Sequence, residues 1–290
     1  MIIRRTVEIT GLLLTDTDAD IVVLAAGRSL LASLNPRDMF EVNAGVIESH
    51  AMVCATTCPN ALVAVTTWPS IYNVPLVSEV YKRLGVYNPD KIIGNCTLNV
   101  MCANTILGNE FYLDPESIHV PLAGGNSSTT MVPLLSKAQP FAEFSQETAE
   151  KLTEEILMCN RRFSRKHSRP LKATRAHAIN RFVLTLVRGL MDQPDAIMTA
   201  FVRSNVLPHC KYCASQLLFG PQGVKLNFGI PKITPYELDL LSTSVAELTR
   251  VYEFVEKYSE SEFDYRKRRS LDRCFTQPGK KQMFAVEQTC

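Results

Sequence analysis

Short apolar runs and helix-like apolar periods alternate along the first third of the chain. Three runs are apolar at nearly every position, at residues 21–27, 61–66 and 92–94. Such runs are typical of strands that are buried on both faces of a parallel sheet. The segments between them, which open at Asn35-Pro36 and at Pro75, carry apolar residues at steps of three and four. This spacing predicts helices, and the strand–helix alternation predicts an α/β fold.

The second half of the chain changes character and is predicted to be richer in helix. Ser145 is placed to cap a helix that runs through Phe163, and residues 179–191 form another helical period. Strands are predicted at residues 197–202 and 215–219, with a glycine-marked turn after the second.

The last helix has the clearest signature. Thr234 is a capping residue, Pro235 lies in the first turn, and Glu237 follows the cap by three residues. Apolar positions then recur up to Val255, which predicts a packed helix face; the pattern is too short to favour a coiled coil. Residues 258–290 are polar and charged and are expected to form a loose tail. Their basic run at 266–269 is either solvated, which is favoured, or in contact with an acidic partner.

Composition limits the classes of function. The chain has 290 residues, 46% of them hydrophobic, and a net charge of +2. This balance supports a buried core and gives no indication of disorder or of nucleic-acid binding. No apolar run reaches the roughly 20 residues that span a bilayer. The opening residues 1–6 resemble neither a secretory signal nor a transit peptide.

The cysteines are predicted to be reduced thiols. There are nine, an odd number with uneven spacing, in a chain long enough to fold without a disulfide framework. The tightest group is His209 with Cys210 and Cys213. A zinc site would need a second ligand pair at suitable spacing, so no metal site is predicted.

A series of sequence blocks, in order along the chain, resembles the malate dehydrogenase family, and in particular its mitochondrial type. Four of them are Val22-Val23-Leu24-Ala25-Ala26-Gly27, Gly85-Val86-Tyr87-Asn88-Pro89, Thr97-Leu98-Asn99-Val100-Met101 and Val120-Pro121-Leu122-Ala123-Gly124-Gly125. Others lie at residues 38–45, 58–62, 74–75, 113–116 and 132–136. The resemblance extends from residue 6 to residue 257, which is nearly everything except the tail.

The resemblance implies an α/β architecture in two parts. An NAD-binding domain with a Rossmann-type parallel sheet is predicted at residues 1–96, and an α+β substrate domain at residues 97–257, followed by the tail. In the family the active site lies in the cleft between the domains, where malate and oxaloacetate are interconverted with NAD. The family also implies a homodimer, or a heterodimer with an intact family member, and a location in the mitochondrial matrix; the cytoplasm is the alternative. No membrane or nucleic-acid partner is expected.

The front of the nucleotide-binding domain is expected to be incomplete. Dinucleotide binding in this fold uses a glycine-rich turn after the first strand, and no G-x-G-x-x-G occurs in the sequence. By resemblance the chain begins at the family's third strand. A strand near Val7 would then lack its natural neighbour, and the strand at residues 22–25 would present a bare edge.

The family's proton relay is replaced by amides. Malate oxidation removes a hydride and a proton, and the family takes up the proton on a histidine that an aspartate orients. The histidine position holds Asn126 and the aspartate position holds Asn99. Neither amide accepts a proton near neutral pH, although the two asparagines can still hydrogen-bond each other. Loss of a general base typically costs about 10²–10⁴ in rate.

The family's substrate clamp is also replaced. Three arginines bind the dicarboxylate in the family, because a guanidinium fork matches a carboxylate. By alignment these positions hold Leu30, Pro36 and Cys102. Arg28 and Arg37 lie near two of them, but a shift of one residue changes where a side chain points.

The cofactor positions are mixed. Trp68 replaces an asparagine that touches cofactor and substrate in the family, and a bulky indole there is expected to obstruct the nicotinamide pocket. Asn43 matches a family cofactor contact, and Thr66, Thr67 and Arg175 fall at further family positions. The basic stretch at residues 161–175 is either an anion-binding surface or a solvated helix end, the latter being favoured. NAD is therefore expected not to bind.

These substitutions predict a malate dehydrogenase-like protein that has lost catalysis and acts as a binding or structural relative. Two alternatives stay open. The chain is an incomplete gene product whose full form binds NAD, or even acts as an NAD-dependent malate dehydrogenase; or it is a decaying gene product without function.

Overall fold

The protein is represented by a computed structural model, which describes residues 6–8, 19–27, 35–141, 143–167 and 172–276. Within these residues one mixed sheet of nine strands has the order β1-β2-β3-β4-β7-β8-β5-β6, and β9 pairs with β8. The strands are β1 (Thr6–Glu8), β2 (Ile21–Leu24), β3 (Leu62–Val65), β4 (Ile92–Asn95), β5 (Leu122–Gly124), β6 (Met131–Pro133), β7 (Ile197–Arg203), β8 (Tyr212–Gly220) and β9 (Gly223–Asn227).

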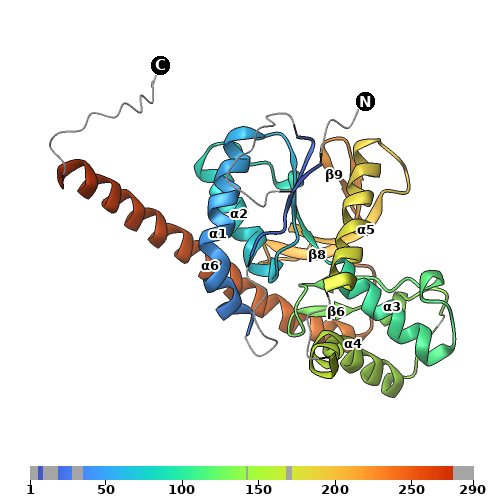
Figure 1. Cartoon of the computed structure of the whole chain (residues 1–290). Coiled ribbons are helices and arrows are strands. Elements are labelled where there is room, and N and C mark those ends of the chain that lie inside the picture. Colours follow the sequence, from blue (N-terminus) through green and yellow to red (C-terminus); the bar gives the residue numbers. More distant parts are fainter. Residues whose placement is uncertain (1–5, 9–18, 28–34, 142, 168–171, 277–290) are drawn as a thin grey trace.

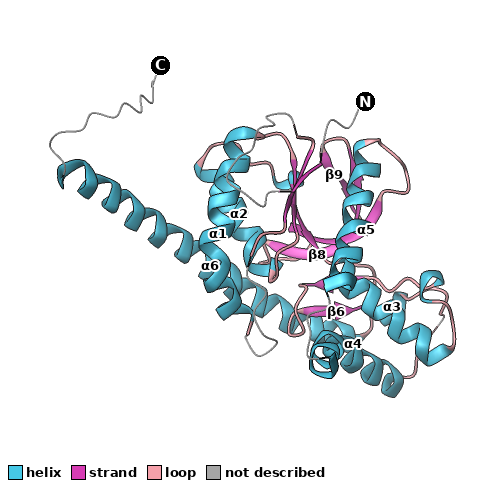
Figure 2. Cartoon of the chain, viewed as in Figure 1, coloured by secondary structure: helices cyan, strands magenta, loops and turns pink. Residues whose placement is uncertain are grey.

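Six α-helices lie in the described part of the chain (Figure 2). They are α1 (Pro36–Thr57), α2 (Ser70–Arg83), α3 (Thr97–Phe111), α4 (Gln146–His167), α5 (Lys172–Leu190) and α6 (Pro235–Thr276). Single 3₁₀ turns occur at Pro89–Lys91, Pro115–Ser117 and Leu135–Lys137. None of the described helices is both long and apolar enough to cross a bilayer.

The first four strands run parallel, and β7 then joins β4 in the antiparallel sense, so a single sheet continues from the first half of the chain into the second. Alternate residues of the strands point to opposite faces. Val22 and Val63 belong to a core with α1, α2 and α6, whereas Ile21 and Leu62 belong to a core with α5. Figure 1 shows α1 and α2 on one side of these strands and α5 on the other. The predicted α/β class, with its strands buried on both faces, is confirmed.

Two expectations about the ends of the described chain are wrong. The strand near Val7 has a neighbour, because β1 pairs in parallel with β2, Val7 opposite Val22. This pairing covers the edge of β2 that was expected to be bare, and it satisfies backbone groups that an edge leaves open. Residues 258–276 are not a loose tail but the continuation of α6. Tyr258 helps to anchor them, because its ring packs 5.2 Å from Phe40 of α1.

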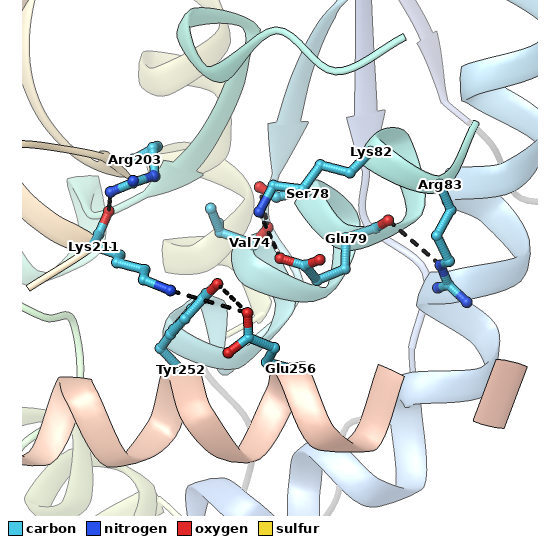
Figure 3. A network of polar contacts seen from close by, with 9 residues as sticks. All are labelled: Val74, Ser78, Glu79, Lys82, Arg83, Arg203, Lys211, Tyr252 and Glu256. Atoms are coloured by element: carbon cyan, nitrogen blue, oxygen red, sulfur yellow. Dashed lines mark hydrogen bonds and ion pairs between the residues drawn. The ribbon is translucent and has the colours of Figure 1, made fainter. Parts of the chain in front are cut away.

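The α6 helix begins with the predicted capping box and is fastened to both halves of the molecule. The amide of Glu237 donates to the Thr234 hydroxyl at 3.3 Å, and Glu237 accepts from the Thr234 amide at 2.9 Å. Glu237 also accepts from the Ser136 amide at 2.9 Å. Further along, the Tyr252 hydroxyl donates to Glu256 at 2.8 Å, and Lys211 lies 4.0 Å over the Tyr252 ring (Figure 3). The helix thereby holds the loop between β7 and β8 against the body of the protein.

Other elements differ from the predictions in extent. Helix α2 begins at Ser70, five residues before the predicted start at Pro75. Because Pro75 lies inside this helix, the sequence pattern did not indicate the turn that precedes it. The three-residue strands β5 and β6 were not predicted, because each is too short to show a period.

Candidate functional site

Asn126 is held by a tight glycine turn at the end of β5. Gly124 has φ +78°, a conformation that side-chain-bearing residues rarely adopt. A Cβ atom on Gly125 would collide with the Thr130 side chain. The Gly125 amide donates to the Thr130 carbonyl at 2.7 Å, and the Ser244 hydroxyl donates to the same carbonyl at 2.5 Å. The two glycines therefore let the chain turn in a space where Thr130, just before β6, and Ser244 of α6 leave no room for a side chain at Gly124, and Thr130 leaves none at Gly125.

Asn99 meets Asn126 from the first turn of α3. Its amide nitrogen donates to the backbone carbonyl of Asn126 at 2.9 Å. The two residues are 6% and 8% exposed, so the bond is formed away from bulk water. The predicted contact between the asparagines is present, in the form of side chain to main chain.

The side chain of Asn126 is held by two partners that sequence reasoning missed. Its amide nitrogen donates to the hydroxyl of Ser70, at the start of α2, and to the carbonyl of Asn95, at the end of β4, at 3.2 Å. Ligand-facing residues of α/β sheets gather beyond the carboxyl ends of strands, and this rule could have pointed to Asn95. Ser70 gives no comparable signal, because its place depends on where α2 begins. We name Asn99, Asn126, Ser70 and the Asn95 carbonyl the amide cluster.

The amide cluster holds its members in place without a proton acceptor. The side-chain nitrogen of Asn126 donates to the neutral oxygens of Ser70 and Asn95, and that of Asn99 donates to the Asn126 carbonyl. The side-chain oxygen of Asn126 is buried and has no hydrogen-bond partner among the described residues. An amide oxygen can receive a hydrogen bond but does not take up a proton near neutral pH. The arrangement can bind a hydrogen-bond donor; general-base chemistry would need another group.

Cys102, at the third predicted arginine position, turns to a neighbouring helix. It lies on α3, about one turn after Asn99, and shares a hydrogen bond with Cys159 of α4. That bond, together with burial, raises the pKa of the Cys102 thiol. A neutral thiol cannot replace a guanidinium as a carboxylate clamp. Of the other two positions, Pro36 is the half-buried first residue of α1, and Leu30 lies outside the described residues.

The predicted cofactor positions near Gly27 form hydrogen bonds and contacts within the fold. The Thr67 hydroxyl donates to the carbonyls of Ala26 at 2.7 Å and Leu24 at 3.2 Å. The Thr66 hydroxyl donates to Leu24 as well, at 2.9 Å. Asn43 has no exposed surface and lies against the turn at Gly27, which has φ +151°. We name Gly27, Asn43 and Thr67 the turn cluster. Its side chains are buried or bonded within the fold, so they are poorly placed to contact a dinucleotide.

The remaining predicted positions are scattered around these two clusters. Trp68 is half-buried in the connection between β3 and α2, directly after Thr67. Arg175 is exposed in the first turn of α5. The side chains of residues 160–171 lie outside the described set, so the basic stretch there stays a prediction.

The described cysteines are not joined by disulfides in the structure. Cys210 and Cys213, the candidates for a metal site, donate instead to the carbonyls of Tyr212 at 3.0 Å and Ala214 at 3.2 Å. Within the described parts of the chain, three or more histidine, cysteine or acidic side chains nowhere gather as a metal site would require.

Comparison with known proteins places these geometries in a family. Residues 96–258 match the family described as lactate/malate dehydrogenase, alpha/beta C-terminal domain. The match begins one residue before the expected change of domain at Thr97. The chain is 34% identical to mitochondrial malate dehydrogenase of Rattus norvegicus over 231 residues, which is 79% of this chain and 68% of that protein. It is 33% identical to the Homo sapiens protein over the same shares.

Solved structures share the fold at much lower identity. Malate dehydrogenase of Cryptosporidium parvum has a TM-score of 0.71 at 16% identity, covering 82% of this chain and 77% of that one. The Aeropyrum pernix enzyme has a TM-score of 0.70 at 17% identity, covering 81% and 76%. With a family match over more than half of its length and 34% identity to a mitochondrial malate dehydrogenase, the chain belongs to the lactate/malate dehydrogenase family, on its malate dehydrogenase branch.

Proposed function

We propose that this protein is a non-catalytic malate dehydrogenase relative, which keeps the family scaffold for binding or structural purposes and does not turn over malate. One observation carries the proposal: the two positions assigned to the family's base and its orienting acid hold Asn126 and Asn99. The amide of Asn99 bonds to the Asn126 backbone instead of orienting a proton acceptor. The bond keeps the site ordered and leaves it without a group that accepts a proton.

The substrate and cofactor sides support the same conclusion. Cys102 is engaged with Cys159 where a carboxylate would need a guanidinium. Asn43 and Thr67, at the cofactor positions, are closed into internal contacts. One solved relative, from Plasmodium falciparum, is described in complex with NADH; we infer that the present chain does not bind it.

The test is an assay of the purified, folded chain with malate and NAD, and in reverse with oxaloacetate and NADH, beside an intact mitochondrial malate dehydrogenase. We expect no turnover above the background, and no change in NADH fluorescence at millimolar cofactor. Turnover that the Asn126→Ala variant abolishes would refute the proposal. NADH binding without turnover would leave catalysis excluded and would favour a cofactor-binding relative.

The partner we infer is another chain of the family, either a second copy or an intact malate dehydrogenase. The outward side of α1 presents exposed Val42, Val46 and Met52, and its Ser49 and Thr56 hydroxyls bond back to carbonyls of their own helix. Such a surface is apolar and uncharged enough to pack against another chain. Light scattering should give the mass of a dimer, and the Val46→Glu variant should have the mass of a monomer. If the unaltered chain is a monomer at all concentrations, both alone and mixed with the intact enzyme, the inferred partner is wrong.

We also infer a mitochondrial location, because the two relatives compared above, from Rattus norvegicus and Homo sapiens, are mitochondrial malate dehydrogenases. Imaging of the full-length protein with a carboxyl-terminal tag decides between the mitochondrial matrix and the cytoplasm.

A further inference from the structure

We propose that the last part of α6, residues 260–276, is a docking arm that binds helix α4 of a second copy of this chain. We name these residues the arm. The contact joins a basic face of the arm to an acidic face of α4. It is separate from the apolar contact inferred for α1, and it does not depend on whether the chain turns over malate.

The arm continues α6 beyond the part of the helix that packs on the body of the protein. The family match ends at residue 258, whereas α6 continues to Thr276. Ser259 is the last buried position among the described side chains of α6, and Glu260 and Ser261 are exposed. Figure 1 shows the end of the helix standing clear of the other elements. Because a helix rises about 1.5 Å per residue, the arm is about 25 Å long and can reach another molecule.

The helix face that packs on the body becomes basic in the arm. Buried positions recur along α6 at steps of three and four, at Leu241, Ser244, Leu248, Val251, Val255 and Ser259. Continuing the same steps gives Glu262, Arg266, Arg269 and Arg273. We name the three arginine positions the basic stripe. Arginine at these positions does not suit an apolar core, whereas it suits a surface that carries carboxylates.

Helix α4 presents an acidic face with the same spacing. Glu147, Glu150 and Glu154 lie at steps of three and four, and all three are exposed. We name these residues the acidic stripe. Glu150 accepts a hydrogen bond from a neutral side chain of the same helix at 2.9 Å, which leaves its charge in place. The neighbouring Lys151 is paired instead with Glu110 of α3, at 2.8 Å.

The two stripes match in sign, in spacing and in length. Each has three like charges at a step of three and then a step of four, which extend over about 10 Å of helix. In a free chain these like charges destabilise their own helix, because residues three and four apart are neighbours on its surface. Laid side by side, the two helices bring guanidinium groups to carboxylates, a strong pairing. The contact therefore relieves repulsion within both helices.

The two stripes cannot meet within one chain. Strand β6 lies between α4 and the start of α6, since Met131 shares a buried core with Leu152 of α4, and Val132 shares one with Leu241 of α6. Arg266 follows Leu241 by about 25 residues on the same helix, which is a distance of about 38 Å. Figure 1 likewise places α4 near the opposite end of α6 from the arm. The acidic stripe that the arm meets therefore belongs to a second copy.

The experiment measures self-association of the full chain by sedimentation velocity at micromolar concentrations. The Val46→Glu substitution is present throughout, so that the apolar contact inferred for α1 does not contribute. We expect association in low salt whose Kd rises roughly tenfold or more in about 0.5 M sodium chloride, because salt screens exposed charges. A monomer at every concentration and salt would overturn the proposal. Binding to anionic vesicles or to DNA, without self-association, would overturn it as well.

A charge swap assigns the contact to the two stripes. Arg269→Glu in the arm and Glu150→Arg in α4 should each raise the Kd roughly tenfold or more, because each sets like charges against each other. Mixing the two variants should restore association, since each arm then meets the opposite charge on α4 of the other chain. The position of the arm outside the body predicts an unchanged Tm for Arg269→Glu, so its loss of association is not a loss of folding.

The matched control is Arg268→Glu, which makes the same change of charge in the arm at a position off the basic stripe. It should leave the Kd nearly unchanged, with the same helical circular dichroism as Arg269→Glu. If Arg268→Glu weakens association as much as Arg269→Glu does, or if mixing the swapped variants restores nothing, the assignment of the contact to the two stripes is wrong.

Cross-linking gives an independent readout of the same contact. A carbodiimide couples a lysine amine to a carboxylate that touches it, and Lys267 supplies an amine beside Arg266. In a mixture of isotope-labelled and unlabelled chains, we expect Lys267 linked to glutamates of the acidic stripe in pairs of mixed isotope. Links from Lys267 that never join two different chains would contradict the proposal.

Discussion

The turn cluster and the amide cluster lie on either side of Trp68 in sequence, and they differ in how they relate to the family pattern that the resemblance predicts. In the turn cluster, Asn43 still matches the family, and it is fully buried against Gly27. In the amide cluster, Asn99 and Asn126 stand at the two positions that the resemblance assigns to the family's proton relay. The first cluster shapes the turn after β2, whereas the second occupies positions whose family role is chemical. A packing contact thus persists beside positions that, under the proposed function, no longer carry out proton transfer.

The amide cluster is also physically consistent as a neutral site. A buried, charged histidine–aspartate pair is removed from water, and the attraction between the two charges must offset this desolvation penalty. Two amides avoid that penalty and need only hydrogen-bond partners. Asn99 finds one in the Asn126 carbonyl, and Asn126 finds two in Ser70 and Asn95. The Asn126 side-chain oxygen is buried without a partner among the described residues, so the site is neutral but its hydrogen-bonding capacity is not fully used.

The largest effect is expected at Phe40, on the helix that carries Asn43. Its ring is fully buried and stacks on Tyr72 with 5.2 Å between centroids. Phe40→Ala should reduce the free energy of unfolding by about 3–5 kcal/mol, because the cavity cannot close. Val42→Ala, on the exposed side of the same helix, should change it by about 0.5 kcal/mol or less. Similar losses in urea unfolding of both variants would show that the α1 face is not part of the core.

A smaller effect is expected when Asn99 is returned to the family's acid. Asn99→Asp removes the donor to the Asn126 carbonyl and sets a buried carboxylate against it, at a cost of about 1–3 kcal/mol at pH 7. Burial should raise the pKa of the new aspartate, so the folded state binds its proton more tightly than the unfolded state. The unfolding free energy should then fall as pH rises from about 4 to 7.

The control for this acid substitution is Asn109→Asp, on an exposed position of the same helix, which should show little of this dependence. Adding Asn126→His should recover part of the loss, because an imidazolium can pair with the carboxylate. A flat pH profile for Asn99→Asp would mean that this residue is solvated.

The smallest effect is expected in the turn cluster. Thr67→Val removes two hydrogen bonds, to Ala26 and Leu24, and should cost about 1–2 kcal/mol. Thr66→Val removes one bond from a less buried hydroxyl and should cost about half as much. Urea midpoints at unchanged m-value measure both. If Thr66→Val lowered the unfolding free energy more than Thr67→Val, then Thr66, and not Thr67, would be the threonine that stabilises the turn.

Much of the fold could be predicted from the sequence, because many elements have strong local signals. The apolar runs at β2 and β3, the helix start at Asn35-Pro36, the cap at Ser145 and the Thr234–Glu237 box all appear where the pattern placed them. The start of α2 and the strands β5 and β6 could not be predicted. A proline lies inside α2 and obscures where the helix begins, and strands of three residues are too short to show an apolar alternation.

For the candidate site, the sequence by itself determined which side chains stand at the positions that the resemblance assigns, and hence that the side chains of Asn99 and Asn126 offer no proton acceptor. Tertiary structure alone decided what those side chains do. It brought Ser70 and Asn95 to Asn126, set Cys102 against Cys159, and paired β1 with β2. The reason is physical: residue identity fixes the chemistry available, whereas contacts between distant segments depend on how the whole sheet and its helices pack.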